Sequence, residues 1–599
     1  MKISRRLFLE SVGMGAAGEM AASLWGGMPG AQAVRRHAAA AWTPPPVISN
    51  PNILFIIVDQ LRYPQWLSGR QLTVYQEQLI PNITQLIANR SYAFDQYYTA
   101  ATVCSAARAT LLSGLYAPQS GCYTETNEQY LLLPVYWTWG DAIASLNPAY
   151  ANNVWWFGKW HLSRCTGSTP LVPYGFQTRT YPGGAIGNPD PEGVSNEGTN
   201  GGPFEGKTLA RDSEIAGDFI GWITGQAPTI APTTPWCATV SLINPHDIAN
   251  APKFNTTYFP KPAFPPPGSP PSLMNAIPSP WNWENLSDLP QKPPLQLAFQ
   301  ENKAQNHGTV IYPDGWVTFL NDYYWLQNYV DTQIGLVLEA LANSPYAGNT
   351  IILFTADHGE YGGSHGLHDK GDAAYDESIR VPLYVGFPGQ TNTIAMRQMC
   401  SSVDMFGFLC DLATGGSGQW RTAYPNVAHR QSIWDFLYHN SSETRLCAAL
   451  GNIPYIFHTC DETSADPADF NAHIVCLRTK NTPEKPGAKY CTYSHWDPCE
   501  VVPDIGYGQD FEFYDYDPAA TNNTYETGND YFSSDPMVQQ DLANYVAALG
   551  VWTPEATGLI AAELARPLVG TGKNGKLLTN AQQTAQENYF KYLGNSCTA

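Results

Sequence analysis

A cysteine and an arginine stand four residues apart at the head of a short apolar segment, TVCSAARATLLSG, which spans residues 102–114. Ser105 is a residue type that favours the start of a helix, and the apolar run follows it. Cys104 therefore precedes the apolar face, whereas a structural cysteine would lie within it. The spacing predicts a helix whose N-terminus lies beside Cys104, where backbone dipoles stabilise negative charge. Arg108 follows one turn later.

Two acidic pairs, Asp59-Gln60 and Asp357-His358, could bind one cation together. Carboxylate oxygens with amide and imidazole donors beside them suit a hard divalent metal better than a soft one. Further positive donors come from four residues: Lys159, His161, His246 and Lys370. Taken singly, such residues are more often caps, surface charges or structural histidines. Together they are typical of a site that binds an oxyanion ester.

Four short apolar runs lead directly into these residues, within segments 52–60, 154–161, 237–247 and 351–360. Their nearly continuous hydrophobicity is typical of strands buried on both faces of a parallel sheet. Helical periodicity lies between them, for example from Tyr324 to Asn343. Strands that alternate with helices predict a doubly wound α/β core. Because ligands bind beyond the carboxyl ends of such strands, we expect the four clusters to meet at one edge.

The composition and the hydrophobic pattern of the chain change at two places, near residue 251 and past residue 440. Residues 251–295 are rich in proline and predict an ordered loop near the site, with a linker as the alternative. Past residue 440, alternating segments at 473–480, 489–496 and 510–518 predict antiparallel strands. We therefore expect a catalytic domain over residues 50–440 and a smaller C-terminal α+β domain over residues 441–599.

The formal charge of −20 argues against a nucleic-acid partner, because phosphates would be repelled. No run of 18 apolar residues occurs, so no membrane span is expected. Residues 1–33 are similar to a twin-arginine export signal, with a basic disordered tail as the alternative, and residues 34–49 would form a linker. We therefore expect a periplasmic or secreted bacterial protein that uses the twin-arginine export machinery. Five cysteines between residues 447 and 499 make disulfides plausible there, with their pairing left open.

Taken together, these segments resemble the sulfatases of the alkaline phosphatase superfamily. The CSAAR sequence at Cys104, followed by Gly114, is similar to the modification motif of that family, Cys-x-Pro/Ala-x-Arg. The similarity extends in order over about residues 50–530, through NILFIIVDQ, FGKWHL, NPHD, TADHGEYGGSHGLHDKG, YDESIRVPLYV and FEFYDYDPAATNNTYE. A Cys-x-x-x-Arg pattern alone occurs often by chance, whereas the ordered set is specific.

The resemblance implies an alkaline-phosphatase-like fold with a mostly parallel sheet. It also implies a sulfuric-ester hydrolase that cleaves an aryl, alkyl or carbohydrate sulfate. A maturase would convert Cys104 into formylglycine, whose hydrate attacks sulfur with the help of one divalent metal. The implied metal ligands are Asp59, Gln60, Cys104, Asp357 and His358. The implied catalytic residues are Cys104, Arg108, Lys159, His161, His246 and Lys370. Of these, Lys159, His246 and Lys370 would bind the substrate.

Two departures from the family pattern bear on the maturase and the metal. Ala106 stands where proline is commoner, which leaves the type of maturase open. Gln60 and His358 stand where many sulfatases have Asp and Asn, a pairing that resembles choline sulfatases and phosphonate monoester hydrolases. This pairing lowers the negative charge at the metal. We expect Ca²⁺, and the lower negative charge makes Mn²⁺ the alternative.

Three other functions stay open beside the sulfatase. One is a phosphonate monoester or phosphodiester hydrolase on the same scaffold, although the sequence GKWH at residues 158–161 favours sulfate. The others are a non-catalytic sugar-binding relative and a generic periplasmic metalloprotein. The loops that would line the pocket, residues 176–206 and 251–295, carry little family pattern. The identity of the substrate therefore stays open.

Overall fold

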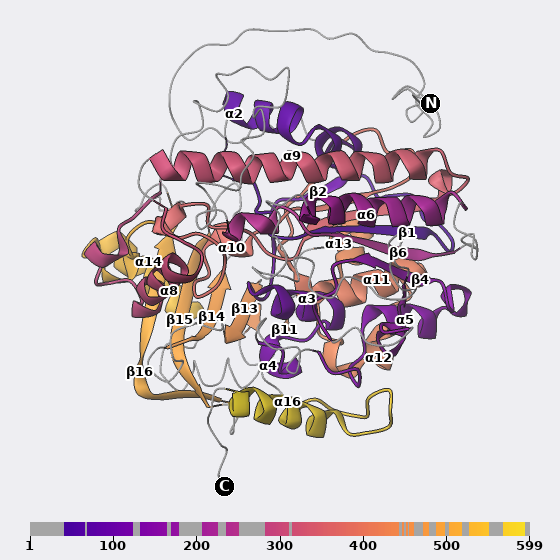
Figure 1. The fold of residues 1–599 in the computed structure, drawn as a ribbon. Coiled ribbons are helices and arrows are strands. Elements are labelled where there is room, and N and C mark those ends of the chain that lie inside the picture. The colour runs from indigo at the N-terminus through magenta and orange to yellow at the C-terminus, as the bar shows by residue number, and fades with distance from the viewer. Residues whose placement is uncertain are drawn as a thin grey trace.

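Buried apolar strands form the centre of the molecule, with helices on both sides of them (Figure 1). The computed structural model describes residues 41–65, 67, 69–123, 132–163, 169–178, 207–225, 235–250, 282–310, 314–441, 446–447, 451–452, 455–460, 471–478, 487–497, 502–517, 526–549 and 567–592. The expected export signal at residues 1–33 and most of the proline-rich segment lie outside these ranges.

The main sheet has eight described strands in the order β5-β4-β6-β1-β7-β8-β2-β9. Their bounds are β1 Asn52–Val58, β2 Tyr92–Phe94, β4 Val154–Gly158, β5 Gln177–Thr178, β6 Cys237–Leu242, β7 Thr350–Ala356, β8 Leu383–Gly386 and β9 Ile394–Met396. The four predicted strands are adjacent and mutually parallel, as β4-β6-β1-β7. Strand β8 runs antiparallel to both of its neighbours. The predicted doubly wound, mostly parallel sheet is therefore confirmed.

The strands are buried on both faces because helices cover both faces. Every residue of β1 and β6 is buried, including the apolar run from Ile53 to Val58. Helices α6 and α9 lie over one face, and α3, α5 and α11 lie over the other (Figure 1). Each fully buried Ile, Leu, Val or Phe side chain contributes about 1.5–3 kcal/mol relative to an exposed one. The sheet is thus the rigid base from which the strand ends project.

The helices have the following bounds: α2 Gly69–Val74, α3 Cys104–Ser113, α4 Ala117–Ser120, α5 Trp139–Leu146, α6 Lys207–Ile223, α8 Pro294–Asn306, α9 Asp314–Ala342, α10 Asp376–Ile379, α11 Met405–Thr414, α12 Trp420–Ala423, α13 Ile433–His439, α14 Pro536–Leu549 and α16 Leu578–Tyr592. The predicted helix at 324–343 starts ten residues earlier than expected, at Asp314. Buried Trp316, Phe319 and Leu320 extend its apolar face toward the N-terminus. The expected irregular segment 251–295 also contains a short 3₁₀ turn, Leu286–Asp288, and the first residues of α8.

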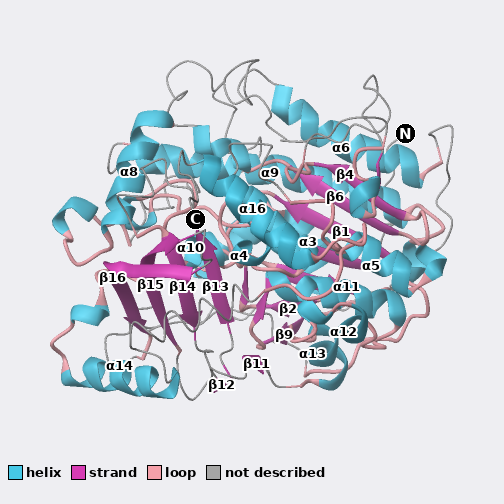
Figure 2. Cartoon of the chain, turned by 90° about the horizontal axis from the view of Figure 1, so that it is seen from below, coloured by secondary structure: helices cyan, strands magenta, loops and turns pink. Residues whose placement is uncertain are grey.

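A second, four-stranded antiparallel sheet lies beside the first (Figure 2). It consists of β13 Tyr455–Cys460, β14 His473–Arg478, β15 Ala488–Asp497 and β16 Val502–Asp515, paired in that order. Three of these strands fall on the segments predicted as antiparallel. Two short pairs complete the described strands: β3 Tyr97–Tyr98 with β10 Cys400–Ser401, and β11 Leu446–Cys447 with β12 Gly451–Asn452. Cys476 and Cys491, directly opposite in register, are buried free thiols.

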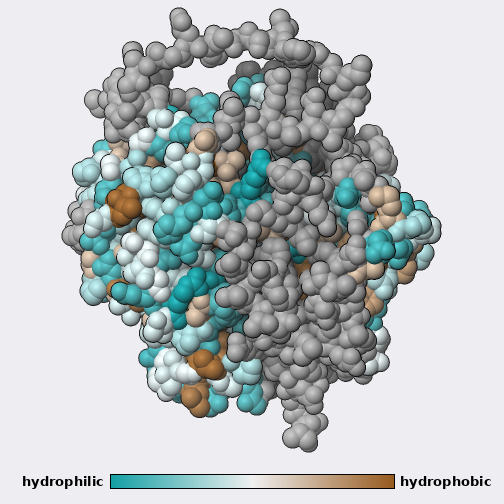
Figure 3. Space-filling view, turned by 180° about the vertical axis from the view of Figure 1, so that it is seen from behind, coloured by the Kyte–Doolittle hydropathy of each residue, from teal (hydrophilic) through white to brown (hydrophobic). Residues whose placement is uncertain are grey.

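The end of the described chain returns to the N-terminal half of the molecule. Lys573 forms a 2.5 Å ion pair with Asp141 at the start of α5, and α16 packs against α4 (Figure 1). The described surface in Figure 3 is mostly hydrophilic, with hydrophobic residues in small separate patches. Within the described ranges, none of the helices combines the length and the apolar character that a membrane crossing requires.

Gly158, the last residue of β4, makes a close backbone approach at the edge that carries the site. Its φ of +94° disfavours other residues, and a Cβ there would lie 2.1 Å from the carbonyl oxygen of Ser241. We expect Gly158→Ala to lower the free energy of unfolding by at least about 3 kcal/mol, measured by urea denaturation.

Gly225 is the matched control for this prediction. It has a φ of +69°, and a Cβ would meet no atom within 4 Å. Gly225→Ala should therefore cost only about 1 kcal/mol, the cost of the left-handed backbone alone. Equal losses for the two variants would show that the contact between Gly158 and Ser241 is not tight.

Candidate functional site

The predicted residues follow four adjacent strands at the carboxyl edge of the sheet. Asp59 follows β1, Lys159 follows β4, and the Asp357-His358 pair follows β7. His246 lies four residues after the end of β6. The expectation that these clusters meet at one edge is thus confirmed by the topology, and the register of β1 with β6 and β7 fixes their relative heights.

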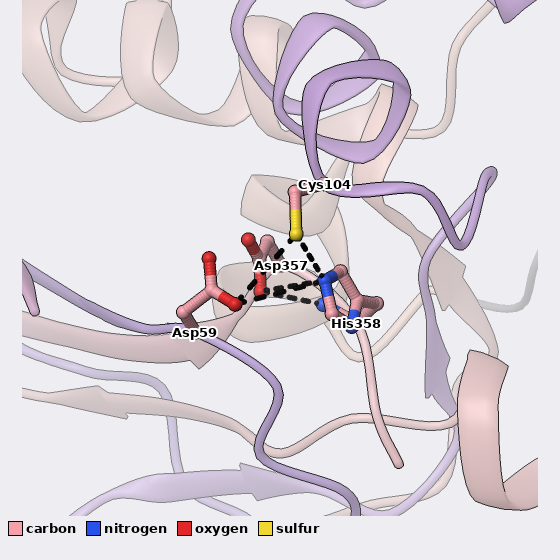
Figure 4. Close-up of side chains that lie close together, drawn as sticks. All are labelled: Asp59, Cys104, Asp357 and His358. Carbon is pink, nitrogen blue, oxygen red and sulfur yellow. Dashed lines mark hydrogen bonds and ion pairs between the residues drawn. The ribbon is translucent and has the colours of Figure 1, made fainter. Parts of the chain in front are cut away.

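Four side chains meet in a cluster of possible metal ligands: Asp59, Cys104, Asp357 and His358 (Figure 4). All four are buried, and their ligand atoms lie within 4.8 Å of one another. Cys104 Sγ lies 2.9 Å from His358 Nε2 and 3.7 Å from Asp59 Oδ1, and His358 Nε2 lies 3.7 Å from Asp357 Oδ1. Ligands about 2.4 Å from one cation lie about 3.4 Å from each other. The spacing of these ligand atoms therefore fits one cation, and the two carboxylates are ligands that a hard divalent ion prefers.

Cationic side chains bind the outer oxygen, Oδ2, of both Asp59 and Asp357. The inner oxygen, Oδ1, of each carboxylate therefore faces the cluster. Arg108 Nη2 and Lys159 Nζ each lie 2.8 Å from Asp59 Oδ2, and Arg108 Nε lies 2.9 Å from Asp357 Oδ2. Arg108 also donates to Ser241 Oγ at 2.9 Å and to the carbonyl of Lys159 at 3.1 Å. Its guanidinium, fully buried, thus joins both carboxylates to strand β6 and to the end of β4.

The imidazole of His358 is oriented by its own backbone neighbour. Nδ1 lies 2.9 Å from the carbonyl oxygen of Gly359, which can only accept a hydrogen bond. Nδ1 therefore carries the proton, and in the neutral ring Nε2 presents its lone pair toward Cys104 and the two carboxylates. This tautomer is the one in which a histidine can bind a metal through Nε2.

The charges of the cluster favour a bound cation. Burial raises the pKa of Asp59, but Lys159, His246 and Arg108 outweigh it and hold that pKa well below its usual range. Burial, together with the charge of Asp59, raises the pKa of Asp357. The second carboxylate therefore loses its proton reluctantly while the first is charged. A divalent cation between them would offset this repulsion.

Cys104 is the first residue of helix α3, one residue earlier than the predicted start at Ser105. The Ser105 hydroxyl does not cap the helix but donates to the carbonyl of His161 at 2.8 Å. Lys159 Nζ lies 3.8 Å from Cys104 Sγ. Helix α3 ends at Gly114, whose φ of +69° suits a glycine cap. The serine thus joins the helix that carries the cysteine to the loop that carries Lys159 and His161.

The loop that carries His246 is fixed by a carboxylate from another element. Asp212, buried in α6, accepts from the backbone nitrogens of Ile243 and Asn244 at 2.7 and 3.2 Å. It also accepts from Asn244 Nδ2 at 2.7 Å. His246 itself is buried, and its charge contributes to the low pKa of Asp59. Asp212 therefore holds the turn that brings His246 to the edge of the cluster.

The amide of Gln60 lies between the cluster and a second polar group. Its backbone nitrogen donates to Asp357 Oδ1 at 3.1 Å, whereas its Nε2 lies 2.5 Å from Glu360 Oε2 and 3.4 Å from Asp369 Oδ1. Its Oε1 accepts from Lys370 Nζ at 3.2 Å. Burial, followed by the charge of Asp369, raises the pKa of Glu360 to about 7. These contacts turn the amide oxygen of Gln60 toward Lys370.

Three buried carboxylates around the site were missed by the sequence analysis: Asp212, Glu360 and Asp369. An acidic residue within the apolar periodicity of α6 was the available signal for Asp212. Glu360 and Asp369 lie within motif segments, but their partners come from distant parts of the chain. Nothing in their spacing could have identified those partners.

Relatives of known function share part of this chain. The choline-sulfatase of Rhizobium meliloti is 27% identical over 393 residues, which are 61% of this chain and 67% of that protein. The chain spans about three fifths of the length of the first curated relatives that it matches.

Solved structures share the fold. A 2-O GAG sulfatase superposes with a TM-score of 0.58 at 18% identity, covering 88% of this chain and 98% of that one. The phosphonate monoester hydrolase of Agrobacterium radiobacter has a TM-score of 0.51 at 18% identity, covering 84% of this chain and 95% of that one. At these identities the likeness is one of fold. The model of the Sulfatase family matches residues 51–416, more than half of the sequence, and the chain therefore belongs to the sulfatase family.

Proposed function

We propose that this protein is a sulfuric-ester hydrolase in which residue 104, converted to formylglycine, is the nucleophile. The observation that carries the proposal is the position of Cys104 Sγ, 2.9 Å from His358 Nε2 and 3.8 Å from Lys159 Nζ at the edge of the sheet. The nucleophile of the family is expected at such a position, buried among possible metal ligands and beside a cation. The sulfatase family model and the choline-sulfatase relative support the same reaction.

We propose that the four clustered residues, Asp59, Asp357, His358 and residue 104, bind the metal. Gln60 would complete the set through its amide oxygen, which in this structure accepts from Lys370 Nζ. A divalent ion, Ca²⁺ or alternatively Mn²⁺, would act there as a Lewis acid on the nucleophile and on the ester oxygens. Arg108 touches the two carboxylates and not the cluster's inner side, so we assign it a positioning role. It keeps one oxygen of each carboxylate free for the cation.

The remaining cations bind and polarise the ester. We propose that Lys159 and Lys370 bind the sulfate oxygens and that His161 hydrogen-bonds the hydrated formylglycine and assists its collapse. We also propose that His246 contacts the leaving oxygen and acts with Lys370 as the general acid. Preorganised donors of this kind lower a barrier most when they face the charge that develops in the transition state. Burial lowers the pKa of Lys159, but the carboxylate of Asp59, 2.8 Å away, is the main cause that raises it, so Lys159 stays protonated.

A phosphonate monoester hydrolase is the second candidate, because the fold also matches that of the Agrobacterium enzyme. The pairing of Gln60 with His358 resembles that of choline sulfatases and of phosphonate monoester hydrolases alike. We favour the sulfate ester because GKWH, residues 158–161, is sulfatase-like. The class of alcohol stays open among aryl, alkyl and carbohydrate sulfates. We further propose that a maturase acts on CSAAR and that the protein is exported folded by the twin-arginine route.

The state of residue 104 is the first test. Mass spectrometry of its peptide, from protein made in the native host, should show an aldehyde in place of the thiol. Cys104→Ala should lower kcat by at least about 10³-fold, because the nucleophile is lost, while urea denaturation shows an intact fold. An Ala variant with wild-type turnover would remove Cys104 from the reaction.

Cation binding provides a test that does not depend on turnover. Saturation with Ca²⁺ at about 100 times its Kd should raise the free energy of unfolding by about 2.7 kcal/mol. His358→Ala should abolish most of this effect in calorimetry and in thermal unfolding, because a ligand is lost. Asp435→Asn is the control, since Asp435 is half exposed on α13 and pairs with His439. A full Ca²⁺ effect in the His358 variant would place the ion elsewhere.

Substrate preference separates the two candidate functions. With 4-nitrophenyl sulfate and 4-nitrophenyl phenylphosphonate at matched concentrations, we expect kcat/KM to be at least about 10-fold higher for the sulfate. The measurement uses purified protein whose conversion at residue 104 has been verified. A preference for the phosphorus ester would assign the chain to the second function.

A further inference from the structure

Asp369 connects the proposed substrate-binding Lys370 to a helix outside the family motifs. Its two oxygens face opposite ways. Oδ1 lies 3.2 Å from Lys370 Nζ and 3.4 Å from Gln60 Nε2, on the side of the site. Oδ2 lies 2.5 Å from Lys303 Nζ and 3.4 Å from His307 Nδ1, on the side of helix α8. The carboxylate is therefore shared between the site and α8.

The backbone of Asp369 is held as firmly as its side chain. Its nitrogen donates to Glu360 Oε1 at 2.8 Å, and its carbonyl accepts from the nitrogen of Tyr361 at 3.0 Å. Its φ of +72° lies in the left-handed region, which is unfavourable for a residue with a Cβ. Such a conformation persists where surrounding contacts over-determine it. Asp369 is 1% exposed, so its charge depends on these partners.

Lys303 and His307 come from the C-terminal end of α8 and from the residue that follows it. Their side chains are 20% and 21% exposed, whereas those of Asp369 and Lys370 are buried. Lys303 also lies 5.2 Å from the ring centre of Phe299, one turn earlier on α8. The two residues therefore form the outer end of a chain of charges that runs inward to Lys370.

We infer that Asp369, anchored by Lys303 and His307, is a positioning residue that sets the places of the Lys370 ammonium and the Gln60 amide. The inference deepens the proposed function, on which it rests. Lys303 pulls the carboxylate outward, so that Asp369 offers one oxygen to Lys370 and leaves the ammonium available to the substrate. Without Lys303, both oxygens of Asp369 can turn to Lys370 and hold its charge away from the ester.

The expected effect depends on the leaving group. The negative charge of a leaving alkoxide is localised on its oxygen, whereas a nitrophenolate spreads it over the ring, so the alkoxide gains more from a cation in the correct place. A displaced Lys370 should therefore slow a poor leaving group more than a good one. A residue that served only stability would lower the amount of folded enzyme and slow both substrates equally.

The experiment compares Lys303→Met with the wild type on 4-nitrophenyl sulfate and on an unactivated alkyl sulfate. We expect kcat to fall about 10-fold for the first and about 100-fold for the second, with a smaller change in KM. Lys303→Arg should restore both rates to within about threefold, because it keeps the ion pair. Asp369→Asn should show the same dependence on the leaving group, since an amide cannot bind two lysines. Binding of inorganic sulfate, measured by calorimetry, should weaken about fivefold in Lys303→Met.

Lys573→Met is the matched control. Lys573 forms an ion pair with Asp141 of the same 2.5 Å length and with a similar exposed fraction, 16%. Lys573 lies on the C-terminal segment that returns to α5. The Lys573→Met variant should be less stable, without a change in the ratio of its turnover rates on the two esters. Equal losses on both esters in Lys303→Met, or unchanged rates, would overturn the inference. Turnover of both esters by the wild type, measured first, tests the proposed function separately.

Discussion

The buried guanidinium of Arg108 is the contact on which the site depends. It spans Asp59 and Asp357, which come from neighbouring strands, and it also reaches Ser241 on a third strand. Two buried carboxylates so close together would repel each other, and a fully buried cation between their outer oxygens removes much of that cost. The same contact turns the inner oxygens toward Cys104. Arg108 thus both offsets the repulsion between the two carboxylates and orients them as metal ligands.

The main features of the fold and of the ligand cluster could be predicted because short stretches of the sequence determine them. A continuous apolar run that ends in a charged residue identifies both a buried strand and the side chain at its carboxyl end. Asp59, Lys159 and Asp357 were predicted in this way, and the parallel topology brought them together. The alternating segments of β14, β15 and β16 likewise carried their own signal.

Other features depend on contacts between distant segments, which no local pattern encodes. The role of Arg108 as a bridge is one example, since its four partners lie between 49 and 249 residues away. Asp212 and Asp369 are further examples, because the position of an acidic residue inside a helix or a motif does not indicate which residues it will contact. The earlier start of α9 was missed for a different reason: Pro313 and Gly315 precede its apolar residues 316–320, and these residue types usually interrupt a helical pattern.

The complete burial of Cys104 has a consequence for the order of events in the life of the chain. Its side chain has no exposed surface, and it lies at the first residue of helix α3 against three other buried side chains. An enzyme that oxidises this cysteine needs access to several residues on each side of it. Under the proposed function, conversion must therefore come before the sheet closes over the segment. A chain that folds first would be trapped as a stable, inactive thiol form.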